Sequence, residues 1–256
     1  QLRIRDLPQA NRTNSNLIEY TKENVFTNSA AVQAGNSPTE FENVTKAESG
    51  ITFTLESTPV TTLAHFIPVS RQVLSDAPAL QSYVDGRLRY GLKYVEDDQL
   101  LNGSGNSGNL KGLWTFRTAF SRANSGDTKI DTIRRAMTQT FLSNYSPDAV
   151  VLHPSDWEDI ELTKDTQGRY IWASPSGMLG ARIWGLPVVQ TLAQTATRFL
   201  VGAFKMSATV WDREDMSVRM SEHNGTDFVK NMVTLLAEER IAQTIERPSG
   251  IVGGTF

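Results

Sequence analysis

The clearest hydrophobic pattern in the chain lies between residues 75 and 103. Asp76 can cap a helix there, Pro78 suits its first turn, and Gly103 follows its last turn. The pattern predicts a helix of about 24 residues, roughly 36 Å long, which needs an extended surface to lie against. Its apolar positions have helical spacing rather than alternation, and they are Leu80, Val84, Leu88, Leu92, Val95 and Leu100.

Strand-like patterns precede this helix. Residues 17–28 are rich in β-branched and aromatic side chains, and from Ile51 apolar and polar residues alternate strictly, with extended character continuing over residues 60–69. The polar, turn-rich residues 29–50 lie between these strands, so the segment predicts a hairpin of roughly 45 residues. Because an isolated two-stranded hairpin is marginal in water, we expect it to lie on another subunit. Residues 1–16 soon become polar, and we expect an arm rather than part of a folded core.

Residues 127–212 predict a compact α/β unit. Asp127 is expected to cap a helix, and residues 154–164 to form a second helix that buries Trp157 and Ile160. The apolar face of the first helix is expected to hold Ile130, Ile133, Met137 and Phe141. Strands are expected at residues 149–153, 168–172, 184–189, 199–202 and 209–211.

The last long pattern, residues 227–247, allows two interpretations. β-Branched side chains such as Val229, Val233 and Ile245 favour one strand of about 60 Å or more, whereas good helix formers in its second half favour a helix. A strand of that length could support the helix at 75–103. Pro248 ends the pattern, and residues 251–252 predict a terminal strand.

Composition narrows the functional classes. The chain has 256 residues, of which 39% are hydrophobic, enough for one large domain or two modest ones. Its net charge of −3 argues against a protein that coats duplex DNA, and the absence of cysteine excludes disulfides and thiolate metal sites. No apolar run approaches the ~20 residues that cross a bilayer, so we expect no membrane contact. The chain starts at Gln1 rather than Met, from which we expect that an upstream segment was removed.

One motif suggests nucleotide binding, but the elements predicted on either side of it do not fit a nucleotide-binding fold. Gly103, Gly105 and Gly108 form a literal G-x-G-x-x-G, with Asp127 about 20 residues beyond. A dinucleotide fold needs this motif between a strand and a helix, but here it follows a helix, and Asn109 stands where a phosphate loop needs lysine. A flexible loop is therefore favoured over a nucleotide-binding enzyme. The three histidines share no metal-ligand spacing, so we expect no metal and no cofactor.

Several long segments together resemble the Hong Kong 97 type of tailed-phage major capsid protein. They are SRQVLSDAPALQSYVDGRLRYGLKYVEDDQLLNG, ESGITF, RYIW…WGLPVV and DFVKNM…EER…RP…GTF, in order along nearly the whole chain. The resemblance implies an α+β fold of four parts. These are an N-terminal arm (1–20), an extended β-hairpin or E-loop (21–67), a peripheral domain with a long spine helix and a long β-sheet (68–118 and 213–247), and an axial α/β domain (119–212 and 248–256).

The resemblance also implies a function. The chain is expected to be a structural protein, not an enzyme, that assembles with itself as hexamers and pentamers into an icosahedral head around double-stranded DNA. Other expected partners are a portal, decoration proteins where a phage has them, and the packaged DNA, contacted weakly and without sequence specificity. The expected location is the virion, after assembly in the host bacterial cytoplasm. Within the same fold, an encapsulin-like bacterial nanocompartment shell is the alternative.

Some members of this family join their subunits by autocatalytic isopeptide bonds. In them a hairpin lysine attacks an asparagine of a neighbouring subunit, and a glutamate assists. This chain resembles them at Lys46, which precedes ESGIT, at Asn231 within VKNM, and at Glu238, which opens EER. A free lysine has a pKa of about 10.4, so its amine needs desolvation and a base before it can attack the amide. A glutamate in an apolar pocket could take that proton.

The spacing of these residues points to a site shared between chains. On one regular strand, Asn231 and Glu238 would face opposite sides about 23 Å apart, so they could not meet within a subunit. Simpler interpretations also stand: Lys46 is a solvated loop residue, Asn231 marks a bulge, and Glu238 pairs with Arg240. The hairpin tip is longer than in the crosslinking members, and Glu214 stands where an apolar pocket residue is expected.

Overall fold

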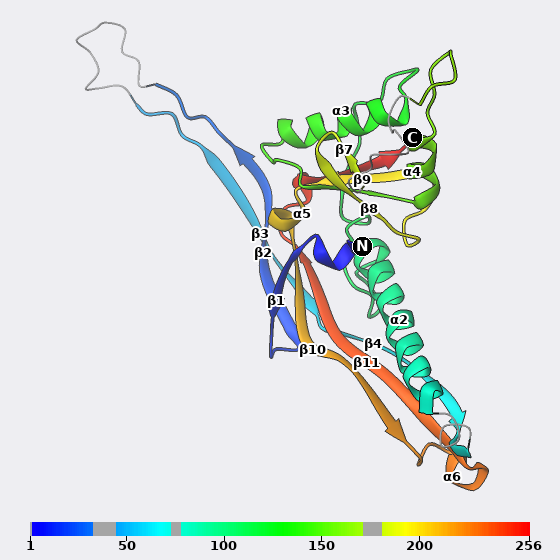
Figure 1. Cartoon of the computed structure of the whole chain (residues 1–256). Helices are drawn as coiled ribbons and strands as arrows, with labels where there is room; N and C mark the ends of the chain where they lie inside the picture. The colour runs from blue at the N-terminus through cyan, green and yellow to red at the C-terminus, as the bar shows by residue number, and fades with distance from the viewer. Residues whose placement is uncertain (1, 33–44, 73–77, 171–180) are drawn as a thin grey trace, which may run out of the picture.

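The computed structural model describes residues 2–32, 45–72, 78–170 and 181–256, which form an elongated body with one projecting hairpin (Figure 1). The helical elements are η1 (Ile4–Asp6), α2 (Pro78–Asn102), α3 (Lys129–Leu142), α4 (Pro154–Glu161), α5 (Phe204–Ser207), α6 (Asp227–Lys230) and η2 (Pro248–Gly250). The strands are β1 (Gln9–Arg12), β2 (Leu17–Thr27), β3 (Gly50–Pro59), β4 (Thr61–Ser70), β5 (Thr118–Ala119), β6 (Ala149–Leu152), β7 (Arg182–Ile183), β8 (Leu186–Gln190), β9 (Arg198–Gly202), β10 (Ala208–Ser221), β11 (Met232–Ile245) and β12 (Ile251–Thr255). They form sheets of order β1-β10-β11-β4, β5-β12-β9-β6-β8-β7 and β2-β3.

The predicted long helix is confirmed as α2, which lies along the four-stranded sheet (Figure 1). Leu88, Leu92 and Leu100 are buried in one core cluster with Leu235 and Ile241 of β11. Burying each such side chain contributes about 1.5–3 kcal/mol, so this stripe holds helix and sheet together.

Two positions of α2 depart from the simple pattern. Val95, which the spacing placed on the apolar stripe, is 44% exposed, because Glu96 beside it takes the buried position. Gly91 lies under the ring of His65, whose Nε2 is 2.8 Å from the carbonyl oxygen of Leu88. A Cβ atom on Gly91 would lie 2.9 Å from that ring, so the glycine makes room for the histidine.

The two longest strands differ from expectation. The strand predicted at 209–211 extends through β10 to 14 residues, antiparallel to β11. The single strand predicted at 227–247 is interrupted: α6 and Asn231 precede β11, which has 14 residues. Asn231 has φ 56° and ψ 41°, a left-handed conformation that ends the short helix and that asparagine adopts more readily than most residues. The terminal strand is confirmed as β12.

The α/β unit predicted at residues 127–212 is confirmed in part, as the six-stranded sheet with its helices α3 and α4 (Figure 1). This sheet also takes in β5 and β12 from outside that range, whereas residues 209–211 belong to β10 of the four-stranded sheet. Thr128, not Asp127, caps α3, because the Asp127 carboxylate pairs with Arg135 at 2.7 Å. Phe141 is 50% exposed rather than buried. The helix predicted at 154–164 ends at Glu161, although Trp157 and Ile160 are buried as expected. Residues 168–170 form a turn and one isolated bridge instead of a strand, and residues 171–172 lie outside the described residues.

The N-terminal segment, predicted as an arm outside any core, is partly folded into the body. Ile4 and Leu7 are buried in the cluster that contains α2, and β1 pairs in parallel with β10. The polar sequence did not suggest this packing, because Arg3 and Arg5 beside Ile4 are charged. Both arginines nevertheless pack in the body, where acidic side chains pair with them.

Those arginines form a partly buried ionic cluster with acidic residues of α2 and β10. Arg3 donates to Glu96 at 2.7 Å and to Asp97 at 3.1 Å. Arg5 donates to Glu96 as well, and to Asp212 at 2.6 Å. Glu96 is fully buried, and such a charge is tolerated only with partners of this kind.

Glu239 of β11 faces the same cluster, and one of its two carboxyl oxygens makes no hydrogen bond to the described residues. Glu239 is 1% exposed, and the oxygen without a partner is Oε1. It lines a cavity of about 260 Å³ with Arg3, Arg5 and Asp212. Burial and the nearby charge of Glu96 raise the pKa of Glu239 to about 7, against the opposing effect of Arg5 and Arg3.

The predicted hairpin is confirmed for β2 and β3, which pair antiparallel from Leu17–Pro59 to Thr27–Gly50. The extended residues 61–70 that follow form β4, which pairs with β11 in the four-stranded sheet. The hairpin root is tied to the body by Glu56, which accepts from Lys111 at 2.7 Å, Lys22 at 3.1 Å and the Tyr20 hydroxyl at 3.0 Å. Burial alone would raise the pKa of Glu56, but these hydrogen bonds outweigh it and lower the pKa to about 2.

The glycine-rich segment after α2 is a hydrogen-bonded turn rather than a flexible loop. Gly105 N donates to Leu110 O at 2.8 Å, and Gly112 N donates to Gly103 O at 2.9 Å. A Cβ atom on Gly103 would overlap the Leu110 carbonyl oxygen, and one on Gly112 would lie 2.6 Å from Leu101 O. Close backbone approach therefore explains these glycines without a phosphate ligand.

We expect Gly112→Ala and Gly103→Ala to lower the free energy of unfolding by about 1–3 kcal/mol, because the backbone must move to admit each methyl group. Gly86→Ala is the matched control within α2. Gly86 is exposed with no atom within 4 Å of the added Cβ, so this change should stabilise by about 0.5–1 kcal/mol. Denaturant unfolding of the unassembled chain measures both effects, and equal stabilities for Gly112→Ala and Gly86→Ala would contradict the close-approach argument.

We also expect Glu239 to make stability depend on pH. The folded chain holds this proton with a pKa of about 7, whereas the ordinary value is 4.5, so stability should fall as the pH rises through this window. Between pH ~5.5 and ~8 the loss should be about 2 kcal/mol, and Glu239→Gln should remove it. Glu19→Gln, at an exposed position of β2, is the control that should leave the pH profile unchanged.

Candidate functional site

Lys46, the predicted attacking residue, lies on the projecting hairpin. It is exposed, four residues before β3 begins at Gly50, and residues 33–44 of the long tip beside it lie outside the described residues. Close to it, the two arms of the hairpin are still joined, because Ser29 N donates to the Ser49 hydroxyl at 3.1 Å. The amine is therefore carried on an extension of β3, away from the body.

Asn231, the predicted acceptor, lies at the far end of the four-stranded sheet. Its side chain is exposed, at the junction where α6 turns into β11. Its carbonyl oxygen accepts from Arg71 N at 3.0 Å, which continues the β11–β4 pairing beyond Met232. The backbone role explains why an asparagine suits this position, while its side-chain amide stays open to solvent.

Glu238, the predicted base, lies in the middle of β11 on the face turned away from α2. Its cross-strand neighbours are Ser217 of β10 and Ala64 of β4. The carboxylate is 22% exposed and pairs with Arg219 at 3.1 Å, not with Arg240 as sequence spacing suggested. Glu238 is therefore in an ion pair at the surface of the sheet rather than in a closed apolar pocket.

The three residues do not meet within one chain. Figure 1 shows the hairpin that carries Lys46 projecting beyond one end of the body, and α6, which Asn231 follows, at the opposite end. Glu238 lies between them, seven residues into the sheet from Asn231. A reaction between Lys46 and Asn231 therefore needs at least two chains.

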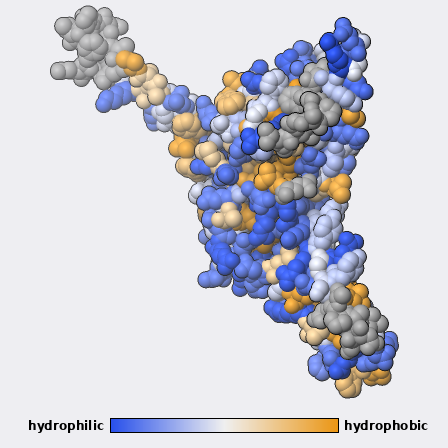
Figure 2. Space-filling model, in the orientation of Figure 1, coloured by the Kyte–Doolittle hydropathy of each residue, from blue (hydrophilic) through white to orange (hydrophobic). Residues whose placement is uncertain are grey.

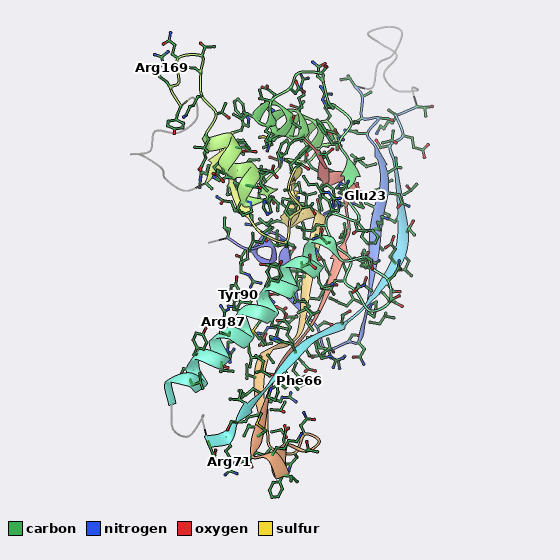
Figure 3. The ribbon with its side chains drawn as sticks, turned by 90° about the vertical axis from the view of Figure 1, so that its right-hand side faces the viewer. Glu23, Phe66, Arg71, Arg87, Tyr90 and Arg169 are labelled. Atoms are coloured by element: carbon green, nitrogen blue, oxygen red, sulfur yellow. The ribbon has the colours of Figure 1, made fainter. Side chains whose placement is uncertain are left out.

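Two features near Glu238 could not be anticipated from spacing alone. Arg219 lies on a neighbouring strand whose register the sequence did not reveal. Phe66 of β4 lies opposite Leu236 of β11 and is 59% exposed (Figure 3), and Ala64, two residues before it, lies opposite Glu238. Glu214 is paired with Arg240 at 3.0 Å, which explains why a charged residue is tolerated there.

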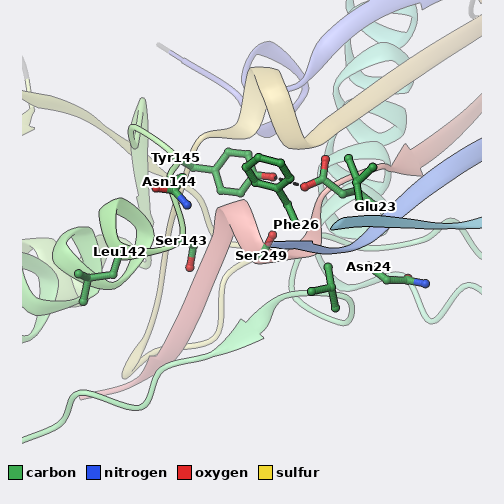
Figure 4. Close-up of a pocket in the computed structure, with 10 residues that line it drawn as sticks. Glu23, Asn24, Phe26, Leu142, Ser143, Asn144, Tyr145 and Ser249 are labelled. Atoms are coloured by element: carbon green, nitrogen blue, oxygen red, sulfur yellow. Dashed lines mark hydrogen bonds between the residues drawn. The ribbon is translucent and has the colours of Figure 1, made fainter. Parts of the chain in front are cut away.

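A second set of contacts fixes the direction of the hairpin. Glu23 of β2 accepts from the Tyr145 hydroxyl at 3.1 Å and from Arg247 at 3.2 Å, and its backbone N–H donates to Glu246 O at 2.9 Å. Figure 4 shows Glu23 and Tyr145 in the lining of a groove of about 520 Å³ between the hairpin and the end of α3. Beyond Glu23 the residues of β2 become exposed, so this is where the hairpin leaves the body.

Within the described residues, no group of three or more histidine, cysteine or acidic side chains could hold a metal ion. His65 packs on α2, and His153 caps α4 by accepting from Ser155 N. In the part of the chain that the structure describes, no helix is long and apolar enough to cross a membrane.

Comparison with known proteins gives concordant results. The chain is 47% identical over 258 residues to the major capsid protein of Enterobacteria phage HK97, an alignment that covers 100% of this chain and 65% of that protein. The chain thus spans just under two thirds of the length of this relative. Its structure is similar to a protein of Microbacterium phage Oxtober96, with a TM-score of 0.76, 14% identity and coverage of 97% of this chain and 89% of that chain. It is also similar to the capsid of a native GTA particle, with a TM-score of 0.73, 16% identity and coverage of 99% and 89%.

These similarities confirm the expected α+β fold of the Hong Kong 97 type. The family model described as the phage capsid family matches residues 1–256, the full length of this sequence. The chain therefore belongs to the phage capsid family.

Proposed function

We propose that this chain is the major shell subunit of a tailed-phage head. It assembles as hexamers and pentamers into an icosahedral particle around double-stranded DNA, in the cytoplasm of a bacterial host. We also propose that the chain divides into an arm, a hairpin, a peripheral domain and an axial domain. A portal and decoration proteins are further proposed partners. The major capsid protein of phage HK97, with 47% identity, supports the assignment.

One observation of the structure carries the proposal: the hairpin holds apolar side chains that the described part of its own chain leaves exposed. Figure 2 shows hydrophobic surface along the projecting hairpin. These side chains range from 49% to 70% exposed, and they are Val25, Phe26, Ile51, Phe53 and Leu55. Exposed apolar surface of this kind marks an interaction site, and a neighbouring copy would cover it.

Electron microscopy of the purified chain tests this proposal. Closed shells support it, and a lone globule with the hairpin folded back contradicts it. Native particles that hold protein cargo, instead of packaged DNA and a tail, would favour the encapsulin alternative.

We further propose that Lys46 of one subunit reacts with Asn231 of a neighbour. The Lys46 amine attacks Cγ of Asn231, a carbon–nitrogen bond forms, and the carbon–amide nitrogen bond breaks to release ammonia. Glu238 takes the proton from the amine and passes it to the departing nitrogen. Each subunit gives one lysine and accepts one, so repetition links the whole shell.

The surroundings of Glu238 are compatible with this role once a neighbour is in place. Arg219, its ion-pair partner, is 66% exposed and can move when a hairpin arrives. The apolar side chains of that hairpin, together with Phe66, would then exclude water from the Glu238 carboxylate. Desolvation of this kind raises the proton affinity of a carboxylate, which is what a base for a lysine requires.

We expect wild-type particles boiled in SDS to run as a ladder or to stay out of the gel, and Lys46→Ala particles to run as a 28.4 kDa subunit. Lys46→Arg should match Lys46→Ala, because a guanidinium stays protonated and cannot attack. Lys205→Ala, at an exposed position of α5, should keep the ladder. Wild-type particles that already run wholly as monomers would exclude the crosslink without excluding the shell.

The acceptor and the base need variants that preserve their structural surroundings. Asn231→Gly keeps the left-handed backbone and removes the amide, whereas alanine would add about 1–2 kcal/mol of backbone strain. Glu238→Gln keeps the shape of the side chain and removes the base. Both should assemble normally by electron microscopy yet lose the ladder, and a ladder of wild-type intensity in either variant would reject that residue's role.

A further inference from the structure

The sequence holds two asparagine–glycine pairs, Asn102 with Gly103 and Asn224 with Gly225. In such a pair the backbone nitrogen of the glycine can attack Cγ of the asparagine side chain, because glycine has no Cβ atom to obstruct the approach. The two pairs share this chemistry but differ in their surroundings. The structure therefore predicts which of the two reacts.

Both reacting groups of the first pair are held in place. The side-chain nitrogen of Asn102 donates to Asp98 Oδ1 at 2.8 Å and to the carbonyl oxygen of Ala193 at 2.7 Å. Gly103 N, the attacking atom, is in a buried residue and donates to Gln99 O at 2.9 Å. The end of α2 would have to open before this nitrogen could reach Cγ of Asn102.

The second pair lies at the surface, in the loop between β10 and α6. Asn224 and Gly225 are both exposed, and Gly225 N makes no hydrogen bond to the described residues. A Cβ atom built on Gly225 would have no other atom within 4 Å, so the space around the pair is open. One hydrogen bond holds the Asn224 side chain, from Nδ2 to Thr234 Oγ1 at 3.2 Å. The pair can therefore react without the opening of a helix or strand.

That hydrogen bond helps to close the segment that carries Asn231. Thr234, its acceptor, donates its own hydroxyl hydrogen to Asp227 Oδ2. Asp227 begins α6 and Thr234 lies in β11, so Asn231, the crosslink acceptor proposed above, lies between them. A carboxylate at position 224 could not donate to Thr234, and the single hydroxyl hydrogen is already given to Asp227. Replacing the amide by a carboxylate would therefore remove the contact and place a second negative charge beside it.

We propose that Asn224 is a site of spontaneous deamidation, and that the change loosens the segment around Asn231. Gly225 N loses its proton and bonds to Cγ of Asn224, while the bond from Cγ to the side-chain nitrogen breaks and ammonia leaves. Water then opens the cyclic imide at either of its carbonyl groups. One opening gives aspartate, and the other gives isoaspartate, in which the main chain continues through Cγ. Water is the co-reactant, and each event adds one negative charge.

The test keeps the purified wild-type chain in mildly alkaline buffer, which promotes loss of the amide proton, and follows its tryptic peptides by mass spectrometry. Residues 220–230 form one tryptic peptide, in which Asn224 is the only asparagine. Deamidation of this peptide should be at least about tenfold faster than that of Asn102, located by fragmentation within residues 94–111. In urea the two rates should converge, because the difference comes from the fold. Asn224→Gln keeps an amide but disfavours ring closure, so its peptide should stay unmodified.

A second measurement tests the effect on the segment around Asn231. Asn224→Asp carries the charge of the deamidated chain, whereas Asn224→Gln keeps a side-chain donor. Hydrogen exchange at the amides of residues 227–231 should be faster in Asn224→Asp than in Asn224→Gln.

Two results would overturn the proposal. Equal deamidation rates at Asn102 and Asn224 in the folded chain would reject the site, and equal hydrogen exchange in the two variants would reject its effect on the segment. Both measurements use the unassembled chain, so their outcome does not depend on the proposed function.

Discussion

Burial of one stripe of α2 against β10, β11 and β4 is the interaction on which the rest of the structure depends. Leu88, Leu92 and Leu100 fix the helix to the sheet, and the N-terminal segment then enters the same cluster through Ile4. The turn after α2 closes on itself through glycine backbone contacts and presents Lys111 to the hairpin root. Arm, sheet and hairpin are therefore all positioned by a single apolar contact.

The parts of the fold that were predictable are those whose own side chains show a clear periodicity. The spacing of apolar residues identified α2, and strict alternation identified β3. The length of β10 was missed, because its outer half is partly exposed and carries charged residues that pair across the sheet. The break at Asn231 was missed because a left-handed residue leaves no periodic signal, and asparagine is common in turns.

The candidate site could be selected only through resemblance, since neither charge nor spacing singles out Lys46, Asn231 or Glu238. The partners of these residues come from strand register and from the neighbouring subunit, which a single sequence does not encode locally. The two adjacent glutamates of β11 also show that sequence position does not reveal surroundings. Glu238 lies at the surface of the sheet, whereas Glu239 is buried beside Arg5 and Glu96. Glu239 is desolvated and Glu238 is not, because α2 covers only the face of the sheet on which Glu239 lies.

The anchoring of the hairpin at Glu23, where it leaves the body, has a mechanical consequence. Phe53 lies opposite Glu23, and Lys46 is seven residues before Phe53, so Lys46 stands up to roughly 23 Å from this anchor. A rotation of the hairpin by about 5° about the anchor would displace the Lys46 amine by about 2 Å, most of the length of a hydrogen bond. The hydrogen bonds that hold Glu23 therefore set how accurately a distant amine is placed.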